Sequence, residues 1–186
     1  HVLNALLRFE NKDYLGAKNE LETNLKNNNN DNFTLVSLAK VYTELSMFEK
    51  AEDTLQIVLE RTPQSLNYKC QLANIYIAQN NYDNALKIID SIICENENYI
   101  YAYALGAKAS LSKQDLERAK DYAQKSISLD MNFAEGYYYL AMVRFEQKDF
   151  EESIECMKRA IMYDINNASY YGKMGEIYKA KEDYKT

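Results

Sequence analysis

The sequence predicts an all-α fold in which antiparallel helix pairs recur every 34 residues. Three observations predict it: a strict internal period, helical spacing of apolar residues within each period, and a scarcity of turn-forming residues. The chain has 186 residues but only 5 glycines and 1 proline. Strand-rich folds need many tight turns, which are built mainly from those residues. Their scarcity favours long helices joined by short connections.

Small residues carry the period at two fixed places. Steps of 34 residues connect one series of small residues, Ala5, Ala39, Ala73, Ala107, Ala141 and Gly175. They also connect a second series, Ala17, Ala51, Ala85, Ala119 and Ser153. No insertion interrupts either series, which is the signature of a repeat architecture. We number positions within a repeat as slots, so that these series occupy slots 8 and 20 and slot 1 falls at Asn32, Leu66, Ile100, Ala134 and Ala168.

Each repeat has the apolar spacing of two helices. In the repeat that begins at Asn32, slots 4, 7, 8 and 11 form one helical stripe, and slots 17, 20, 24, 27 and 28 form another. A short polar joint separates the stripes. At slot 16 the other repeats hold Asp or Asn, with Met47 of this repeat as the exception, and such a side chain can accept a hydrogen bond from the free amides that open the second helix. The small residues at slots 8 and 20 predict that the two helices cross closely there.

This pattern resembles the tetratricopeptide repeat family. The match is best in residues 134–167, where the family's preferences are met by Tyr137, Leu140, Ala141, Phe150 and Ala160. The resemblance implies one array over residues 1–186, a right-handed superhelical α-solenoid in which each repeat contacts its neighbours. The expected divisions are a partial repeat 1–31, repeats 32–65, 66–99, 100–133 and 134–167, and a partial repeat 168–186.

Composition argues against several functional classes. The net charge is −6 with acids and bases mixed along the chain, whereas a nucleic-acid binder would show a basic face. No apolar run approaches the roughly 18 residues of a membrane span, and no targeting segment is visible, so we expect no membrane partner and a cytoplasmic location. Cys70, Cys94 and Cys156 lack the spacing of a metal site. We therefore expect small apolar packing side chains and no metal.

A catalytic constellation cannot be assembled from this sequence. Its single histidine is His1, and it contains neither a glycine-rich phosphate loop nor a His-Glu-x-x-His motif. We therefore expect no enzyme activity and no cofactor. Two functions remain open: a scaffold that binds a peptide or protein segment, and the substrate-presenting arm of a larger enzyme such as a glycosyltransferase.

The resemblance implies that the first helices line a concave groove, with slots 2, 5, 9, 12 and 13 pointing into it. The predicted peptide-binding residues are Asn74, Ile77, Tyr101, Lys108, Leu111, Tyr138, Met142, Phe145 and Glu146. This mixture suits an extended or helical peptide that carries apolar side chains. The carboxylate clamp of chaperone-binding members is not expected, because slot 5 never holds lysine and only Asn74 matches at slot 9.

The tyrosine triplet 137–139 cannot face one way on a helix, because successive residues are about 100° apart. We expect Tyr137 in the core of its repeat, Tyr138 in the groove and Tyr139 at the seam with the preceding repeat.

The repeat 100–133 has small residues at core slots, including Gly106 at slot 7 and Ser110 at slot 11. We expect Tyr101, Tyr103 and Tyr122 to refill part of this space.

The two ends are expected to expose apolar residues that a neighbouring helix would cover. These are Val2, Leu3, Leu6 and Leu7 at one end and Tyr171, Met174, Ile177 and Tyr178 at the other. Such patches predict end-to-end self-association of a chain with these boundaries.

Overall fold

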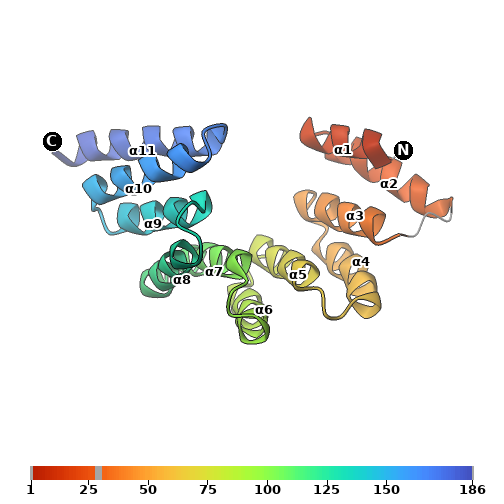
Figure 1. The fold of residues 1–186 in the computed structure, drawn as a ribbon. Coiled ribbons are helices and arrows are strands. Elements are labelled where there is room, and N and C mark those ends of the chain that lie inside the picture. Colours follow the sequence, from red (N-terminus) through yellow and green to blue (C-terminus); the bar gives the residue numbers. More distant parts are fainter. Residues whose placement is uncertain (1, 28–30, 186) are drawn as a thin grey trace. The chain divides into compact units, whose positions relative to one another are not determined.

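The computed structural model describes residues 2–27 and 31–185, which contain eleven α-helices and no strand (Figure 1). The helices are α1 (Val2–Glu10), α2 (Tyr14–Lys26), α3 (Asn32–Glu44), α4 (Phe48–Arg61), α5 (Leu66–Ala78), α6 (Tyr82–Glu95), α7 (Ile100–Ser112), α8 (Leu116–Leu129), α9 (Ala134–Glu146), α10 (Phe150–Tyr163) and α11 (Ala168–Lys185). Consecutive helices pack as pairs, so the predicted all-α solenoid is confirmed.

The helices begin at constant slots. Every first helix from α3 onward starts at slot 1, and every second helix starts at slot 17. The exception to the paired pattern is α11, which continues to Lys185 through the slots where the other repeats turn. Among the described residues, α11 packs against α10, the second helix of the preceding repeat.

The turn within each repeat has the same backbone conformation in five copies. Its slot-15 residue has a positive φ, as found at Lys12, Ser46, Asn80, Gln114 and Lys148. In the repeat 100–133, the N–H of Gln114 donates to the carbonyl of Leu111 at 2.9 Å. The next N–H, of Asp115, donates to the carbonyl of Ser110, also at 2.9 Å. This bond pair is a Schellman motif, whose left-handed position glycine usually occupies.

Aspartates at slot 16 cap the second helices as predicted. The carboxylates of Asp13, Asp115 and Asp149 accept hydrogen bonds from the slot-19 amides at 2.9, 3.2 and 3.2 Å. At the same slot Met47 provides no side-chain cap.

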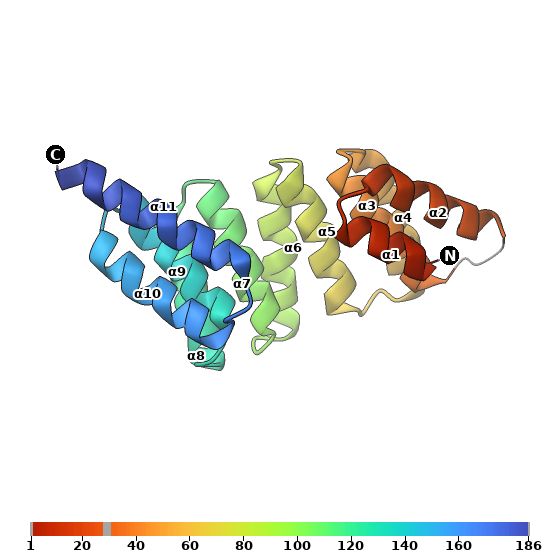
Figure 2. The same cartoon turned by 90° about the horizontal axis from the view of Figure 1, so that it is seen from above.

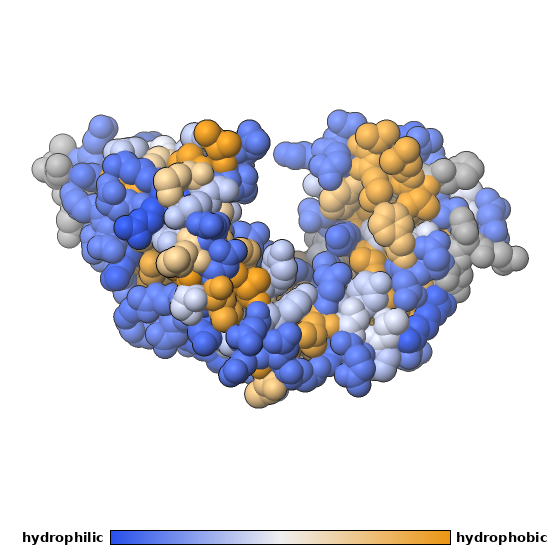
Figure 3. All heavy atoms as spheres, in the orientation of Figure 1, coloured by the Kyte–Doolittle hydropathy of each residue, from blue (hydrophilic) through white to orange (hydrophobic). Residues whose placement is uncertain are grey.

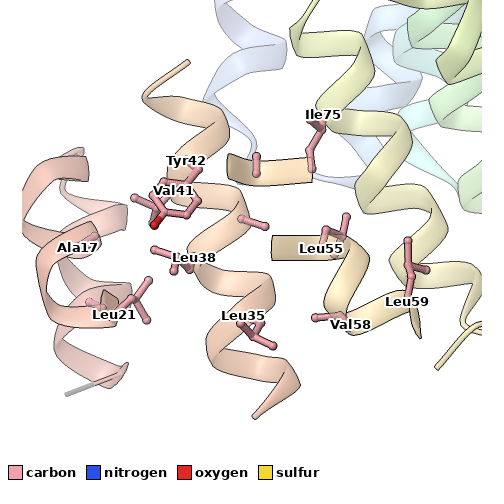
Figure 4. Close-up of a cluster of buried hydrophobic side chains, with 13 residues drawn as sticks. Ala17, Leu21, Leu35, Leu38, Val41, Tyr42, Leu55, Val58, Leu59 and Ile75 are labelled. Atoms are coloured by element: carbon pink, nitrogen blue, oxygen red, sulfur yellow. The ribbon is translucent and has the colours of Figure 1, made fainter. Parts of the chain in front are cut away.

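The chain forms two compact units, residues 1–85 and 86–186. The boundary lies within α6, and the prediction of a single array remains a prediction. In the first unit, buried side chains of α2, α3, α4 and α5 form the core, including Leu21, Leu38, Leu55 and Ile75 (Figure 4). The same cluster includes the slot-8 residues Ala5 and Ala39 and the slot-20 residues Ala17 and Ala51.

In the second unit, the core around α9, α10 and α11 includes Tyr137, Ala141, Met157 and Ile177. The Ser153 hydroxyl donates to the carbonyl of Ala141 at 2.8 Å. This bond joins slot 20 to slot 8 directly, which confirms the predicted close crossing of the two helices.

The aromatic residues of the repeat 100–133 divide between core and surface. Tyr103 is buried, and its hydroxyl donates to the carbonyl of Glu97 at 2.8 Å. Tyr122 packs against Gly106. Tyr101, in contrast, is 59% exposed, so two of the three expected rings refill the space left by small residues.

First and second helices lie in separate layers within each unit (Figures 1 and 2). Adjacent first helices touch directly, α1 with α3 and α7 with α9. These two contacts bring neighbouring first helices side by side in each unit.

The predicted apolar ends are only partly exposed. Ile177 is fully buried and Met174 half-buried, whereas Tyr171 and Tyr178 are exposed. At α1, Leu3 and Leu7 are exposed. Within residues 2–27 and 31–185, no helix combines the length and the apolarity that crossing a bilayer requires.

Candidate functional site

A pocket of about 380 Å³ lies in the first unit between the first helices α1, α3 and α5. Its size falls within the range of roughly 300–1,000 Å³ that is typical of ligand sites. Its lining residues are Ala5, Leu6, Phe9, Glu10, Leu21, Phe33, Val36, Ser37, Lys40, Val41, Asn67, Tyr68 and Gln71.

The walls of this pocket are mainly apolar. Leu6, Phe9, Val36 and Tyr68 are half-buried and surround its interior. Phe33 stands at the mouth with 59% of its surface exposed. Figure 3 shows apolar residues gathered over α1 and the adjoining part of α3.

Polar groups lie around the mouth. Asn67 and Gln71 bring two amides from α5, while Lys40 and Glu10 bring one charge of each sign from α3 and α1. Among the described residues, neither the Lys40 ammonium nor the Glu10 carboxylate takes part in an ion pair. Both charged groups are exposed and available to a ligand.

Part of the pocket lining occupies the slots that predicted the groove. Leu6, Phe9 and Glu10 occupy slots 9, 12 and 13. Three of the five residues contributed by α3, Phe33, Val36 and Lys40, occupy slots 2, 5 and 9, whereas Ser37 and Val41 occupy slots 6 and 10. These residues were not among the predicted ones, because the slots were applied only from the repeat 66–99 onward. The same rule applied one repeat earlier would have found them.

Two predicted residues belong to the first unit but do not line this pocket. Asn74 is half-buried on α5 and is not without an interaction partner. Ile77 is buried, with 7% of its surface exposed.

The other predicted residues lie on α7 and α9 of the second unit. Tyr101 packs edge-on against Phe133, with ring centroids 5.8 Å apart. Lys108 and Leu111 are half-buried, and Glu146 is exposed. Met142 and Phe145 are half-buried and pack against the core cluster of this unit. The predicted set therefore combines accessible side chains with others that also support the core.

The tyrosine triplet divides as the helix geometry requires. Tyr137 is buried in the core cluster, as predicted. Tyr138 is half-buried and stacks on Tyr170 of α11, with centroids 5.0 Å apart, and meets Tyr139 edge-on at 5.1 Å. Burial raises the pKa of both Tyr138 and Tyr139. Tyr138 thus presents only part of its ring to a ligand, because Tyr170 covers the rest.

The cysteines have the properties of packing residues rather than reactive groups. Cys70 and Cys156 are buried, and burial raises the pKa of each thiol to about 11. A thiol with such a pKa is almost entirely protonated at neutral pH and is a poor nucleophile. Within the described residues, no group of His, Cys, Asp and Glu side chains is arranged to hold a metal ion.

Two family models described as "Tetratricopeptide repeat" match this chain, one over residues 71–98 and one over residues 134–167. A curated relative, anaphase-promoting complex subunit 3 of Schizosaccharomyces pombe, is 26% identical over 127 residues. That alignment covers 68% of this chain and 19% of the relative. The chain therefore spans about a fifth of the length of the curated relative it matches.

Solved structures share the fold. A thermophilic tetratricopeptide repeat (TPR) protein of Thermus thermophilus superimposes with a TM-score of 0.80 at 16% identity, covering 95% of this chain and 96% of that protein. YrrB, described as a TPR protein with an unusual peptide-binding site, gives a TM-score of 0.59 at 15% identity, covering 92% of this chain and 89% of YrrB. At these identities the likeness shows a common architecture.

Proposed function

Because the chain belongs to the tetratricopeptide repeat family, we propose that it is a non-catalytic interaction module. Its ligand would be a peptide or protein segment held on the exposed faces of the first helices. The observation that carries this proposal is the pocket between α1, α3 and α5, whose lining includes residues at the groove slots of each of these helices.

The chemistry of the pocket supports a peptide ligand. Apolar walls take up side chains, while amides at the mouth can pair with the N–H and C=O groups of an extended backbone. The relatives support the same class of ligand, since YrrB is described as having a peptide-binding site and the curated relative is a subunit of a multi-protein complex.

In the second unit, we propose that the ligand surface consists of the predicted residues on α7 and α9. Tyr101 and Glu146 offer the most accessible side chains. Tyr138 would contact the ligand together with Tyr170, because the two rings are stacked. Aromatic side chains of this kind often supply the energetic centre of an interface.

The proposal is tested by selecting peptides from a displayed random library on the immobilised chain. Enrichment of specific peptides is expected. For peptides bound by the second unit, the double variant Tyr138→Ala/Met142→Ala should lose affinity. The matched control Gln124→Ala/Lys125→Ala alters exposed residues of the second helix α8 and should bind normally. Failure to enrich any peptide would refute the proposal.

The same surfaces would also serve the substrate-presenting arm of a larger enzyme such as a glycosyltransferase. Sugar transfer by a longer protein that contains this sequence, lost when the first-helix surface is altered, would favour that alternative.

A further inference from the structure

We propose that the pocket between α1, α3 and α5 recognises a short peptide motif in which one large apolar side chain is flanked by one acidic residue. The apolar side chain would enter the pocket and the carboxylate would pair with Lys40. This inference rests on the proposed function and specifies the chemistry of the segment that the first unit binds.

The apolar part of the motif follows from the size and walls of the pocket. A volume of about 380 Å³ accommodates a leucine, methionine or aromatic side chain together with neighbouring backbone. Phe9, Val36 and Tyr68 provide apolar contacts from three helices. Phe33 is 59% exposed at the mouth, so a ligand that covers its ring removes apolar surface from water, which favours binding.

The backbone of the motif has partners on α5. Asn67 and Gln71 lie one helical turn apart on the rim, and each amide can both donate and accept hydrogen bonds. An extended segment presents alternating N–H and C=O groups that such amides can satisfy. A rim of this kind fixes the direction of a peptide while the apolar walls hold its side chain.

The acidic part of the motif follows from Lys40. Lys40 lines the pocket and is exposed, and its ammonium is in no ion pair within the described residues. A carboxylate there would form a charge-assisted hydrogen bond, which is stronger than a neutral one.

Glu10 limits the motif to a single acidic residue. It lines the same pocket from α1 and carries a negative charge. A run of acidic residues would therefore meet repulsion on the α1 side, whereas one acidic residue beside the apolar anchor would reach Lys40 and avoid Glu10. The pocket is thus expected to discriminate against polyacidic segments.

The test compares displayed-peptide selections on the wild-type chain and on Lys40→Glu. Wild type should enrich peptides with a large apolar residue next to Asp or Glu, and Lys40→Glu should enrich Lys or Arg in the flanking position. In fluorescence anisotropy, a peptide enriched on wild type should bind Lys40→Glu about tenfold or more weakly, as expected for reversing a charge in an interface. Lys87→Glu alters an exposed lysine of the second helix α6 and should bind like wild type.

A second variant tests the apolar anchor. Phe33→Ala changes an exposed side chain, so the chain should fold normally while the same peptide loses affinity several-fold. Circular dichroism of each variant establishes that folding is unchanged.

Several outcomes would overturn the inference. Enriched peptides without an acidic residue, or identical motifs on wild type and Lys40→Glu, would refute it while leaving the proposed function intact. Loss of binding only in Tyr138→Ala/Met142→Ala would place recognition in the second unit. A wild-type dimer that Phe33→Ala converts to a monomer would assign this surface to a second copy of the chain. No enrichment at all would refute both proposals.

Discussion

Tyr122 occupies the space that a side chain at position 106 would need. A Cβ built on Gly106 would lie 2.8 Å from Cδ2 of the Tyr122 ring, too close for an undisturbed contact. The hydroxyl of the same tyrosine donates to Oδ1 of Asp90 at 2.6 Å. Arg118 donates to both oxygens of that carboxylate at 2.8 and 2.7 Å. One side chain therefore fills the gap left by a glycine and joins two successive second helices.

Removing this ring should strongly destabilise the second unit. Tyr122→Ala is expected to reduce the free energy of unfolding by about 3–5 kcal/mol, because it leaves a cavity beside Gly106. Tyr122→Phe keeps the ring but loses the hydroxyl, which donates to Asp90 and accepts from Nε and Nη2 of Arg118, so its cost should be about 1–3 kcal/mol. Urea unfolding followed by circular dichroism measures both. Equal losses for the two variants would show that the hydroxyl, rather than the ring, dominates.

Slot 8 should tolerate a larger side chain only where no second helix covers it. Ala141 is fully buried at a helix crossing, so Ala141→Leu should destabilise the chain by about 1–3 kcal/mol. Gly175 occupies the same slot on α11, and a Cβ there would meet no atom within 4 Å. Gly175→Ala should therefore stabilise α11 by about 0.5–1 kcal/mol, because alanine favours the helix. Thermal unfolding of both variants tests these opposite signs. The prediction is wrong if both substitutions lower the stability of the chain.

Glycine at slot 15 should stabilise the turn within a repeat. Gln114 has a φ of 66°, a left-handed conformation that costs a residue with a Cβ about 1–2 kcal/mol relative to a right-handed one. Gln114→Gly should relieve this cost, but glycine also gives the unfolded chain more conformational freedom, which offsets part of the gain. The free energy of unfolding should therefore rise by up to about 1 kcal/mol. The control Gln124→Gly lies inside α8 and should lower it by about 1 kcal/mol. Chemical denaturation that gave the same sign for both would contradict the prediction.

Three tyrosines should make the fold sensitive to alkaline pH. Burial raises the pKa of Tyr42 and of Tyr122 to about 12, and the hydrogen bond with Glu52 raises that of Tyr76 to about 12. The ordinary value is 10.0, so between these values the unfolded chain releases protons that the folded chain retains. Stability is therefore fully present below about pH 10 and is lost as the pH rises toward 12.

Urea midpoints measured together with tyrosinate absorbance across this range test the alkaline loss. Tyr76→Phe removes one of the titrating groups and should flatten the pH dependence. An unchanged slope in that variant would mean that Tyr76 contributes nothing to it.

The sequence predicted those features that are decided within one repeat. The starts of the helices, the aspartate caps and the small residues at the Ala141–Ser153 crossing all depend on neighbours less than 34 residues away. Each of these local relationships recurs in several repeats of the same sequence. One sequence therefore provides several independent examples from which they can be predicted.

Features that depend on the next helix were harder to predict. Tyr138 occupies a groove slot, yet Tyr170 from the following repeat covers part of its ring. The pocket in the first unit draws residues from three first helices, and its depth depends on how closely these helices pack.

The contact of Asp90 with Arg118 and Tyr122 is specific to one junction between repeats. These residues occupy slot 25 of one repeat and slots 19 and 23 of the next. The same pairing one junction later would set Gln124 beside Glu152 and Cys156, which cannot reproduce a bridge between a carboxylate and a guanidinium. If recombination deleted residues 100–133, the helical faces would remain in register, but Glu152 would be brought toward the like-charged Asp90. The repeats therefore share a helical pattern but are not interchangeable at this junction. Deletion of a whole repeat would remove an attractive ion pair and bring two carboxylates together.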